Sequence, residues 1–547
     1  MEQREVDVLI IGAGPAGMIL GIALERHGIA FRIVDKDNEP TKVTRAPVIW
    51  PRTQEILAAL GIRDKWLSES EEMREESLHF YGKAAGVVPA VAANSPYPKA
   101  RFCGQSVTER LLDQHLTEIG HPVEYGKEAI RYEDGAQEAC VTVREAKGSE
   151  EIIRAKWVVS AEGSHSIVRK AIGLEFEGEK YVGYRIHIAD VQAKWTFATP
   201  VGQTFFMVEE HAYMGGQRLP GHPDRFYFYI LTTDEKPDDS SNDLKLEEVQ
   251  QLVRRISGDQ EATLSNPSWL NSARYKHGVA AAYRRGRAML IGDAARSAPP
   301  LYGQGMNYAI HDSWNLAWKL AFVVKGLGPE TLLETFAAER HKLGTEIDTR
   351  IDRTFRFITE PKLLQAKLTR ALAPALLSSD HLTHSFEQQF TEMDVSYAGA
   401  GLNEQASSLG KLKAGERSPA LWVKRLPDCT LVNLLDLYDG TTWNLLVIAS
   451  AAEDREELRI LIEYARSKQN SFPDVLRAVL LSQGPQRPDP LPFHTVVDAE
   501  ARFVREQNLP KSSLLLVRPD GYIALATRHG NHDMTAYLNR WLLPAPQ

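Results

Sequence analysis

The stretch that decides the fold is VDVLIIGAGPAGMILGIALERHGIAFRIVD, residues 6–35. It contains an apolar strand, a glycine turn, a helix and a second strand that ends in an acid. Gly12, Gly14 and Gly17 form the pattern G-x-G-x-x-G, which permits a tight turn, close approach of a pyrophosphate, and close packing of helix on strand. Asp35 follows Gly17 by eighteen residues, about where an acid accepts hydrogen bonds from a ribose. We therefore predict a dinucleotide-binding βαβ unit.

Two other interpretations of this stretch are weaker. Glycine turns occur in many α/β proteins, but here the strand, the helix and the acid all stand in the expected order. The apolar run 8–24 could belong to a signal peptide or a membrane span. Glu2, Glu5 and Asp7 precede it in place of a basic segment, however, and glycines interrupt it.

Composition bounds the protein class. A chain of 547 residues predicts about three domains, and 43% hydrophobic with 25% charged residues is ordinary for a globular protein. The net charge of −8 argues against nucleic acid as a partner, and no other apolar stretch is long enough to predict a membrane span. Cys103, Cys140 and Cys429 are far apart, so we expect neither disulfides nor a metal site, and we expect a cytoplasmic protein.

Two further strand-to-turn signals follow. In RAKWVVSAEGSHSIVRKAIG (residues 154–173) a buried strand runs into Glu162-Gly163 and then a helix. In residues 286–326 a short strand ends at Gly292-Asp293, and the turn PPLYGQG feeds a long helix. Between these signals, a pattern that alternates from one residue to the next predicts antiparallel strands at 187–191, 204–208, 213–217 and 225–231. The strand ends point at a shared ligand crevice, and the middle strands indicate a separate sheet.

Together these stretches resemble the three FAD fingerprints of the single-component flavoprotein aromatic hydroxylases, the family of p-hydroxybenzoate hydroxylase and phenol hydroxylase. The resemblance covers nearly the whole chain. It implies that the first turn and Asp35 hold the ADP half of FAD, that Asp293 binds the ribityl chain, and that residues 299–307 lie along the isoalloxazine ring. The cofactor-binding residues that it implies are Gly12, Gly14, Pro15, Ala16, Gly17, Asp35, Lys36, Arg45, Gln105, Glu162, Gly163, Asp293, Pro300, Gly303, Gly305, Met306 and Asn307.

The chain departs from the family pattern at several positions. Glu162 replaces the usual aspartate, which bears on NAD(P)H handling, while Arg296 and Tyr302 replace the usual histidine and glycine near the flavin. Pro47 stands where phenol hydroxylase has an aspartate that assists the phenol. The resemblance therefore leaves the substrate-activating side chain unassigned.

Candidates for the chemistry come from the middle strands and the flavin loops. An aromatic-lined pocket would suit a planar ligand, although an alternating Phe-Tyr-Phe-Tyr strand at 226–229 more often packs a core. As catalytic residues we predict Arg45, Tyr213, His211 and Pro300, and as substrate-binding residues Trp50, Arg185, Tyr213, Arg218 and Tyr227.

The predicted fold is α/β, with a Rossmann-type FAD-binding domain, an interleaved antiparallel-sheet substrate domain and a C-terminal thioredoxin-like domain. The FAD-binding domain takes residues 1–80, 102–183 and 276–330, and the substrate domain 81–101 and 184–275. A helical connection takes 331–398, and residues 399–547 resemble the thioredoxin-like domain of phenol hydroxylase. That domain has no C-x-x-C pair, which argues against thiol exchange.

The resemblance implies an FAD-dependent monooxygenase that uses NADPH or NADH and O2 to hydroxylate a phenolic or polycyclic aromatic small molecule through a flavin C4a-hydroperoxide. With only one dinucleotide fingerprint, the nicotinamide would bind transiently. A homodimer is compatible with this prediction. The alternatives are a flavin-binding oxidoreductase without oxygenation, a flavin halogenase, whose W-x-W-x-I-P signature is absent from the sequence, and a flavin-holding scaffold that acts by protein contacts.

Overall fold

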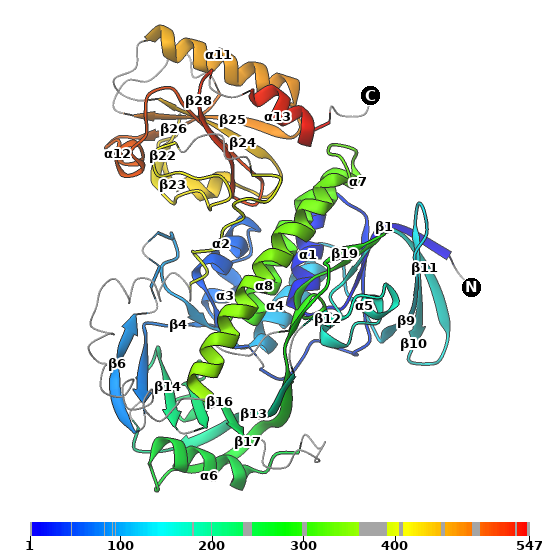
Figure 1. Ribbon diagram of the computed structural model, residues 1–547, viewed down its shortest axis with the longest axis vertical. Coiled ribbons are helices and arrows are strands. Elements are labelled where there is room, and N and C mark those ends of the chain that lie inside the picture. Colours follow the sequence, from blue (N-terminus) through cyan, green and yellow to red (C-terminus); the bar gives the residue numbers. More distant parts are fainter. Residues whose placement is uncertain are drawn as a thin grey trace.

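Three large sheets make up most of the molecule (Figure 1). A computed structural model describes residues 3–44, 46–80, 82–89, 91–92, 94–177, 180–197, 200–209, 211–233, 243–297, 303–359, 391–403, 409–449, 455–483, 493–530 and 533–543. One sheet with α6 lies at the bottom of Figure 1, the C-terminal sheet lies at the top, and the sheet that contains β1 lies between them. The predicted α/β class is confirmed.

The central sheet is the predicted dinucleotide-binding unit. Its main path is β19-β20-β11-β1-β2-β8, and β1 pairs in parallel with both β2 and β11. The carboxyl ends of β1 and β11 therefore meet at one edge. The strands are β1 Gln3–Ile11, β2 Phe31–Asp35, β8 Glu124–Tyr125, β9 Lys127–Glu133, β10 Ala139–Glu145, β11 Glu150–Ser160, β19 Arg284–Arg285 and β20 Ala288–Leu290.

Helices pack on this sheet and on one another. Helix α1 packs against α7 and α4, and its buried apolar residues belong to the same core as β1 and β11. These helices are α1 Pro15–Arg26, α4 Gln105–Glu118 and α7 Gly305–Val324, with α2 Pro51–Ala59, α3 Asp64–Leu67 and α5 Ile167–Ala171 nearby. Two small sheets join them, formed by β3 Val48–Ile49, β4 Glu71–Glu72 and β7 Arg101–Phe102, and by β12 Phe176–Glu177, β18 Gly278–Ala280 and β21 Arg296–Ser297.

The second large sheet has the strand order β17-β13-β16-β15-β14-β5-β6. The four strands predicted from alternation are confirmed as β13 to β16. Strand β5, which the sequence prediction placed in segment 1–80, pairs in parallel with β14, so this sheet begins before residue 81. The strands are β5 Glu75–Phe80, β6 Lys83–Pro89, β13 Lys180–Lys194, β14 Gln203–Glu209, β15 Ala212–Arg218, β16 Arg225–Thr233 and β17 Thr263–Lys276.

The two faces of the second sheet have different partners. Phe205 and Phe228 pack with the apolar residues of α6 (Leu246–Ser257) on one face. On the other face Tyr213 and Leu231 pack with Ile347 of α8 (Thr331–Thr359). Helix α8 agrees with the predicted helical connection as far as it is described, since residues 360–390 lie outside the described part of the chain.

The C-terminal sheet has the order β23-β22-β26-β25-β24-β27-β28. Strands β24 and β25 are parallel and are joined by α11, whereas β27 runs antiparallel to β24. The thioredoxin-like identity of this region stays a prediction. Its elements are β22 Trp422–Arg425, β23 Thr430–Asn433, β24 Trp443–Ala449, α11 Arg455–Ser471, β25 Leu476–Gln483, β26 His494–Asp498, α12 Arg502–Gln507, β27 Ser513–Val517, β28 Ile523–Arg528 and α13 Met534–Trp541.

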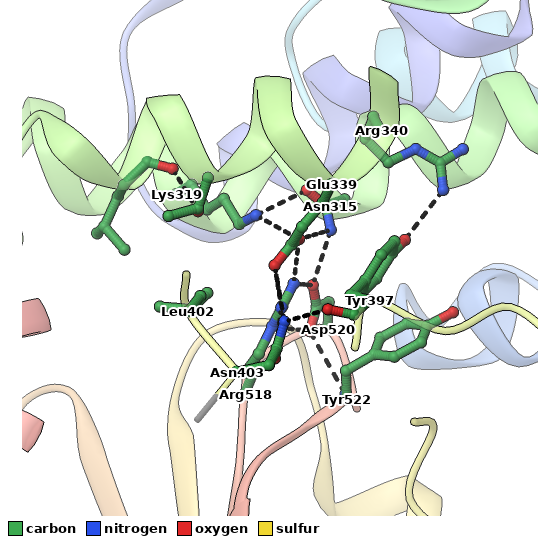
Figure 2. Close-up of polar contacts among 12 residues, drawn as sticks. Asn315, Lys319, Glu339, Arg340, Tyr397, Leu402, Asn403, Arg518, Asp520 and Tyr522 are labelled. Carbon is green, nitrogen blue, oxygen red and sulfur yellow. Dashed lines mark hydrogen bonds and ion pairs between the residues drawn. The ribbon is translucent and has the colours of Figure 1, made fainter. Parts of the chain in front are cut away.

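A buried ionic cluster joins the C-terminal sheet to α7 and α8 (Figure 2). The Arg518 guanidinium donates to both oxygens of Glu339, at 2.6 and 3.0 Å, and Lys319 Nζ donates to Glu339 Oε2 at 2.7 Å. Asp520, on the turn between β27 and β28, pairs with Arg518 and accepts from Trp318 Nε1 at 3.1 Å. The cluster thus holds one face of α7 against the C-terminal sheet.

The charge at the centre of this cluster is the Glu339 carboxylate. Burial raises its pKa, but Arg518 and Lys319 outweigh burial and lower the pKa to about 2. Burial also lowers the pKa of Lys319 to about 8. Arg518 and Lys319 both face the Glu339 carboxylate, and Arg518 stays charged in any protein environment. Glu339 is therefore ionised, and its charge, together with that of Asp520 beside Arg518, makes the burial of both cations tolerable.

The described residues were also compared with the requirements of a membrane span, a metal site and a disulfide. Within the described ranges, no helix combines the length and apolarity needed to cross a bilayer. The same residues contain no group of three or more His, Cys, Asp or Glu side chains placed to hold a metal ion. The three cysteines do not pair with one another, and Cys103 is buried whereas Cys429 is exposed.

Candidate active site

A cavity of about 830 Å³ opens where the central sheet meets the second sheet. That volume is in the range of small-molecule and cofactor sites. All three predicted glycine turns border it, and so do side chains from β5, β14, β15 and β16. The predicted cofactor residues on its wall are Gly12, Gly14, Pro15, Ala16, Asp35, Lys36, Gln105, Glu162, Gly163, Asp293, Gly303, Gly305 and Met306.

The first turn depends on its glycines for different reasons. Gly12 has φ +104°, and a Cβ there would lie 2.3 Å from the carbonyl oxygen of Ala161. A Cβ on Gly17 would lie 2.0 Å from the carbonyl oxygen of Gly12, so Gly17 serves close packing and does not face the cavity. A Cβ on Gly14 would meet nothing within 4 Å and would project into the space at the start of α1. This open cradle at a helix N-terminus fits a pyrophosphate.

Asp35 ties the end of β2 to the first turn. Its Oδ2 accepts from the backbone N–H of Ala13 at 2.5 Å, and its Oδ1 accepts from that of Asp37 at 2.8 Å. Burial raises the pKa of the Asp35 carboxyl, and the two backbone hydrogen bonds act in the opposite direction. Each carboxylate oxygen has a second lone pair, and the side chain borders the cavity, as binding to a ribose hydroxyl requires.

The second turn is held by Glu162. Its carboxylate accepts from the hydroxyls of Ser160 and Ser166, both at 2.7 Å, and from the backbone N–H of Ile167 at 3.1 Å and of Val168 at 3.3 Å. These bonds cap α5 and engage both oxygens. The side chain therefore shapes this wall of the cavity through contacts within the protein.

The third turn adds Asp293, Gly303 and Gly305 to the wall of the cavity. Asn307 was predicted to contact the cofactor, but it is buried and is not among the cavity-lining residues. Its amide donates to the carbonyl oxygens of Val48 and Gly303, both at 2.9 Å, and accepts from the backbone N–H of Trp50 at 3.0 Å. Asn307 thus braces the loop before α2 against the third turn.

A row of polar side chains crosses the second sheet at the cavity. Glu76 of β5 lies opposite Thr204 of β14, Thr204 lies opposite Gln217 of β15, and Gln217 lies opposite Tyr227 of β16. Directly opposed residues share one face of a sheet, and all four side chains border the cavity. Trp50 and Met73 contribute apolar surface to the same cavity. The site can therefore receive an aromatic ring with a polar substituent.

Glu76 is the functional candidate that the sequence prediction missed. Burial raises the pKa of its carboxyl to about 7, although the hydrogen bond with Thr204 lowers it. A carboxyl with such a pKa in a cavity wall is a candidate for acid–base chemistry.

The pleat of the second sheet determines which of the predicted substrate residues face the cavity. Tyr227 faces the cavity as predicted, and so does Tyr229. Arg218 lies opposite Phe226 and Arg185 lies opposite Thr232, so both belong to the alternate rows, on the α6 face. Arg185 donates to Ser272 Oγ at 3.2 Å there.

The other predictions have mixed outcomes. Trp50 borders the cavity as predicted. Tyr213 shares the Tyr227 face but is 1% exposed, packed under α8 and away from the cavity wall. His211, at the exposed turn before β15, is also absent from that wall. Arg45 and Pro300 lie outside the described residues.

Comparisons with known proteins agree with this geometry. Residues 5–350 match the FAD binding domain family. The chain is 31% identical over 400 residues to a rifampicin monooxygenase of Streptomyces venezuelae, covering 72% of this chain and 79% of that one. It is 28% identical over 553 residues to a flavin-dependent monooxygenase of Mycobacteroides abscessus, covering 97% and 99%. The solved structure of OxyS anhydrotetracycline hydroxylase from Streptomyces rimosus superimposes with a TM-score of 0.76 at 23% identity, covering 99% and 100%.

The fold and the cavity define a flavoprotein, and the chain belongs to the FAD-binding domain family. The prediction of a single-component FAD-dependent aromatic hydroxylase is confirmed by these comparisons, as is FAD as the cofactor.

Proposed function

We propose that this protein is an NAD(P)H-dependent FAD monooxygenase that hydroxylates a phenolic or polycyclic aromatic small molecule. In the overall reaction the substrate, O2, NAD(P)H and one proton give the hydroxylated substrate, NAD(P)+ and water. One observation carries the proposal: a single cavity joins the glycine turns of the nucleotide-binding sheet to the polar row of the second sheet. The bound cofactor and the bound substrate would therefore occupy one continuous cavity.

Several residues would hold FAD. The cradle at Gly14 and the α1 N-terminus would take the pyrophosphate, and Asp35 a ribose hydroxyl. Asp293 would bind the ribityl chain, and Gly303 and Gly305 would face the ring system. When bound, FAD supplies electron transfer from NAD(P)H to O2 and delivery of one oxygen atom to the ring.

The residues that face the substrate come from both sides of the cavity. Trp50 and Met73 would exclude water and contact an aromatic ring, while Tyr227 and Gln217 would receive its polar substituent. The similar proteins are named for rifampicin and anhydrotetracycline, which supports an aromatic substrate class here.

The proposal includes the reductant, the compartment and the oligomeric state. The chain carries one dinucleotide fingerprint, so the nicotinamide would bind transiently at the cavity. The need for NAD(P)H favours action in the cytoplasm, and so does the finding that the three cysteines form no disulfide with one another. A homodimer is compatible with the fold, and light scattering of the purified protein would test it.

The test uses the full-length protein and two variants. We expect yellow protein with one FAD per chain, NAD(P)H oxidation stimulated by phenols, naphthols or anthraquinone-type compounds, and incorporation of ¹⁸O from ¹⁸O2 into product. Asp293→Ala should give colourless protein, whereas Asp64→Ala, at an exposed position on α3, should stay yellow.

The possible outcomes separate the alternatives. Stimulated NAD(P)H oxidation that yields only hydrogen peroxide would indicate an oxidoreductase without oxygenation. Bound FAD without NAD(P)H turnover would indicate a flavin-holding scaffold. Stoichiometric FAD in Asp293→Ala would show that the ribityl contact is misplaced.

A further inference from the structure

The polar row is set by strand pairing across four strands. β5 and β14 are parallel, β14 and β15 antiparallel, and β15 and β16 antiparallel, with Glu76, Thr204, Gln217 and Tyr227 in register. A slip of one residue in any pair would send a side chain to the opposite face. The row is therefore a property of the whole sheet, and Glu76 is its carboxylate.

The Glu76 side chain is hydrogen-bonded to a hydroxyl group and borders the cavity. Thr204 is the side chain that hydrogen-bonds to it, and burial is the other influence on its pKa. On β16 the titratable groups that border the cavity are the phenols of Tyr227 and Tyr229. Beyond Tyr227 in the same row, Asp190 of β13 forms an ion pair with Arg225 at 2.5 Å.

The row on one side of the polar row is apolar and aromatic. Leu78, Phe206 and Tyr229 follow on the same face, packed in the cluster under α8. A Cβ on Gly215 would lie 2.0 Å from Cζ of Tyr229, so glycine at this position makes room for the Tyr229 ring at the cavity. The polar row thus forms a narrow band beside an aromatic surface, which suits a flat molecule with a hydroxyl on one edge.

We propose that Glu76 is the base that accepts the proton of a phenolic hydroxyl on the substrate, with Gln217 and Tyr227 orienting that hydroxyl. This inference rests on the proposed function and assigns its missing acid–base residue. The phenolic O–H bond breaks, an O–H bond forms on the Glu76 carboxylate, and the electron pair stays on the phenolate oxygen. The step changes no oxidation state, and it raises electron density on the ring that is to be hydroxylated.

The electrostatics of the site favour this role. A pKa of about 7 in place of 4.5 makes the carboxylate a roughly 300-fold stronger base. At pH 8 most of the Glu76 side chains are still ionised and can accept a proton. Below pH 7 the group is increasingly protonated and cannot act as a base, so the acidic limb of the activity profile should report Glu76.

The decisive experiment compares Glu76→Gln with Glu75→Gln. Glutamine keeps the shape of the side chain and removes the base. Glu75 is the adjacent residue of β5, bonds to Gln203 Nε2 at 2.7 Å and does not border the cavity, so it is a matched control. The probe is 2-naphthol, whose neutral and anionic forms have different absorption spectra, added without O2 to each FAD-loaded protein at pH 8.

We expect 2-naphthol to absorb at longer wavelength when bound to the wild type or Glu75→Gln than when bound to Glu76→Gln, because only the first two proteins offer a carboxylate that accepts a hydrogen bond from the naphthol hydroxyl, and we expect no proton to be released to the buffer. Calorimetry in two buffers of different ionisation enthalpy counts the protons. In turnover, Glu76→Gln should lower kcat/KM by about 100-fold or more and lose the fall in rate below pH 7.

Three results would overturn the inference: the same naphthol spectrum in Glu76→Gln as in the wild type, no bound naphthol in the wild type, or an acidic limb that persists in Glu76→Gln. The FAD content of each protein distinguishes failure of the proposed function from failure of the Glu76 assignment. Protein without FAD contradicts the proposed function, whereas FAD-loaded variants that all behave like the wild type contradict only the assignment of Glu76.

Discussion

Glu339→Gln should destabilise the protein by about 3 kcal/mol at pH 7. The substitution keeps the size of the side chain but removes the carboxylate that faces Arg518 and Lys319. A pKa lowered from 4.5 to about 2 corresponds to roughly 3 kcal/mol at 1.36 kcal/mol per pKa unit. Measured costs of removing one partner from a buried ion pair are about 3–5 kcal/mol, so the two estimates agree.

The sign of the pH dependence follows from the same pKa. Because the folded-state pKa of Glu339 lies below the unfolded value, its stabilisation is fully present above about pH 4.5 and is lost as the pH falls through about 2. The difference between wild type and variant should therefore shrink to less than half by about pH 3.

Unfolding in urea tests this prediction, since urea adds no ions that would screen the cluster. Trp318 and Trp443, with ring centroids 5.5 Å apart, report the interface by fluorescence. The control is Glu334→Gln on the same helix, where the side chain is 65% exposed and pairs with Arg284, and where we expect a change of about 0.5 kcal/mol or less. Equal stabilities of the two variants would refute the reasoning.

Two further predictions concern the cavity and the cysteines. Gly14→Val should leave the fold intact, because a Cβ there meets nothing within 4 Å, but should lower FAD affinity at least tenfold by filling the cradle; fluorescence titration with FAD measures this, and unchanged affinity would mean that the pyrophosphate lies elsewhere. Burial raises the pKa of the Cys103 thiol to about 11, so at pH 8 a disulfide reagent should modify exposed Cys429 first; mass mapping that finds Cys103 modified first would contradict the buried position.

The glycine turns could be predicted because their constraints are local. Gly12 adopts φ +104° and Gly17 packs where a Cβ does not fit, so both positions require glycine and can be recognised in the sequence. Four strands of the second sheet, β13 to β16, could be predicted for a similar reason, since burial of one face imposes alternation along each strand.

The pairing of distant strands could not be predicted. Glu76 reaches the cavity only because β5 joins β14, more than a hundred residues later in the chain, by a parallel pairing with no local signal. The sequence also could not place Arg185 and Arg218 on the face away from the polar row, because identifying a strand does not fix which face each of its residues takes. The contact of Glu339 with Arg518 spans 179 residues and was invisible for the same reason.

The turn between β27 and β28 bears on how this chain can be re-engineered. From that turn Asp520 contacts α7, whose other end borders the cavity, and Arg518 contacts Glu339 of α8. A chimera that exchanged the C-terminal sheet for that of a relative would leave Lys319 and Glu339 buried without Arg518 and Asp520, unless the new segment supplied equivalent residues. Recombination at this boundary therefore succeeds only when the acid and its cations are inherited as a set.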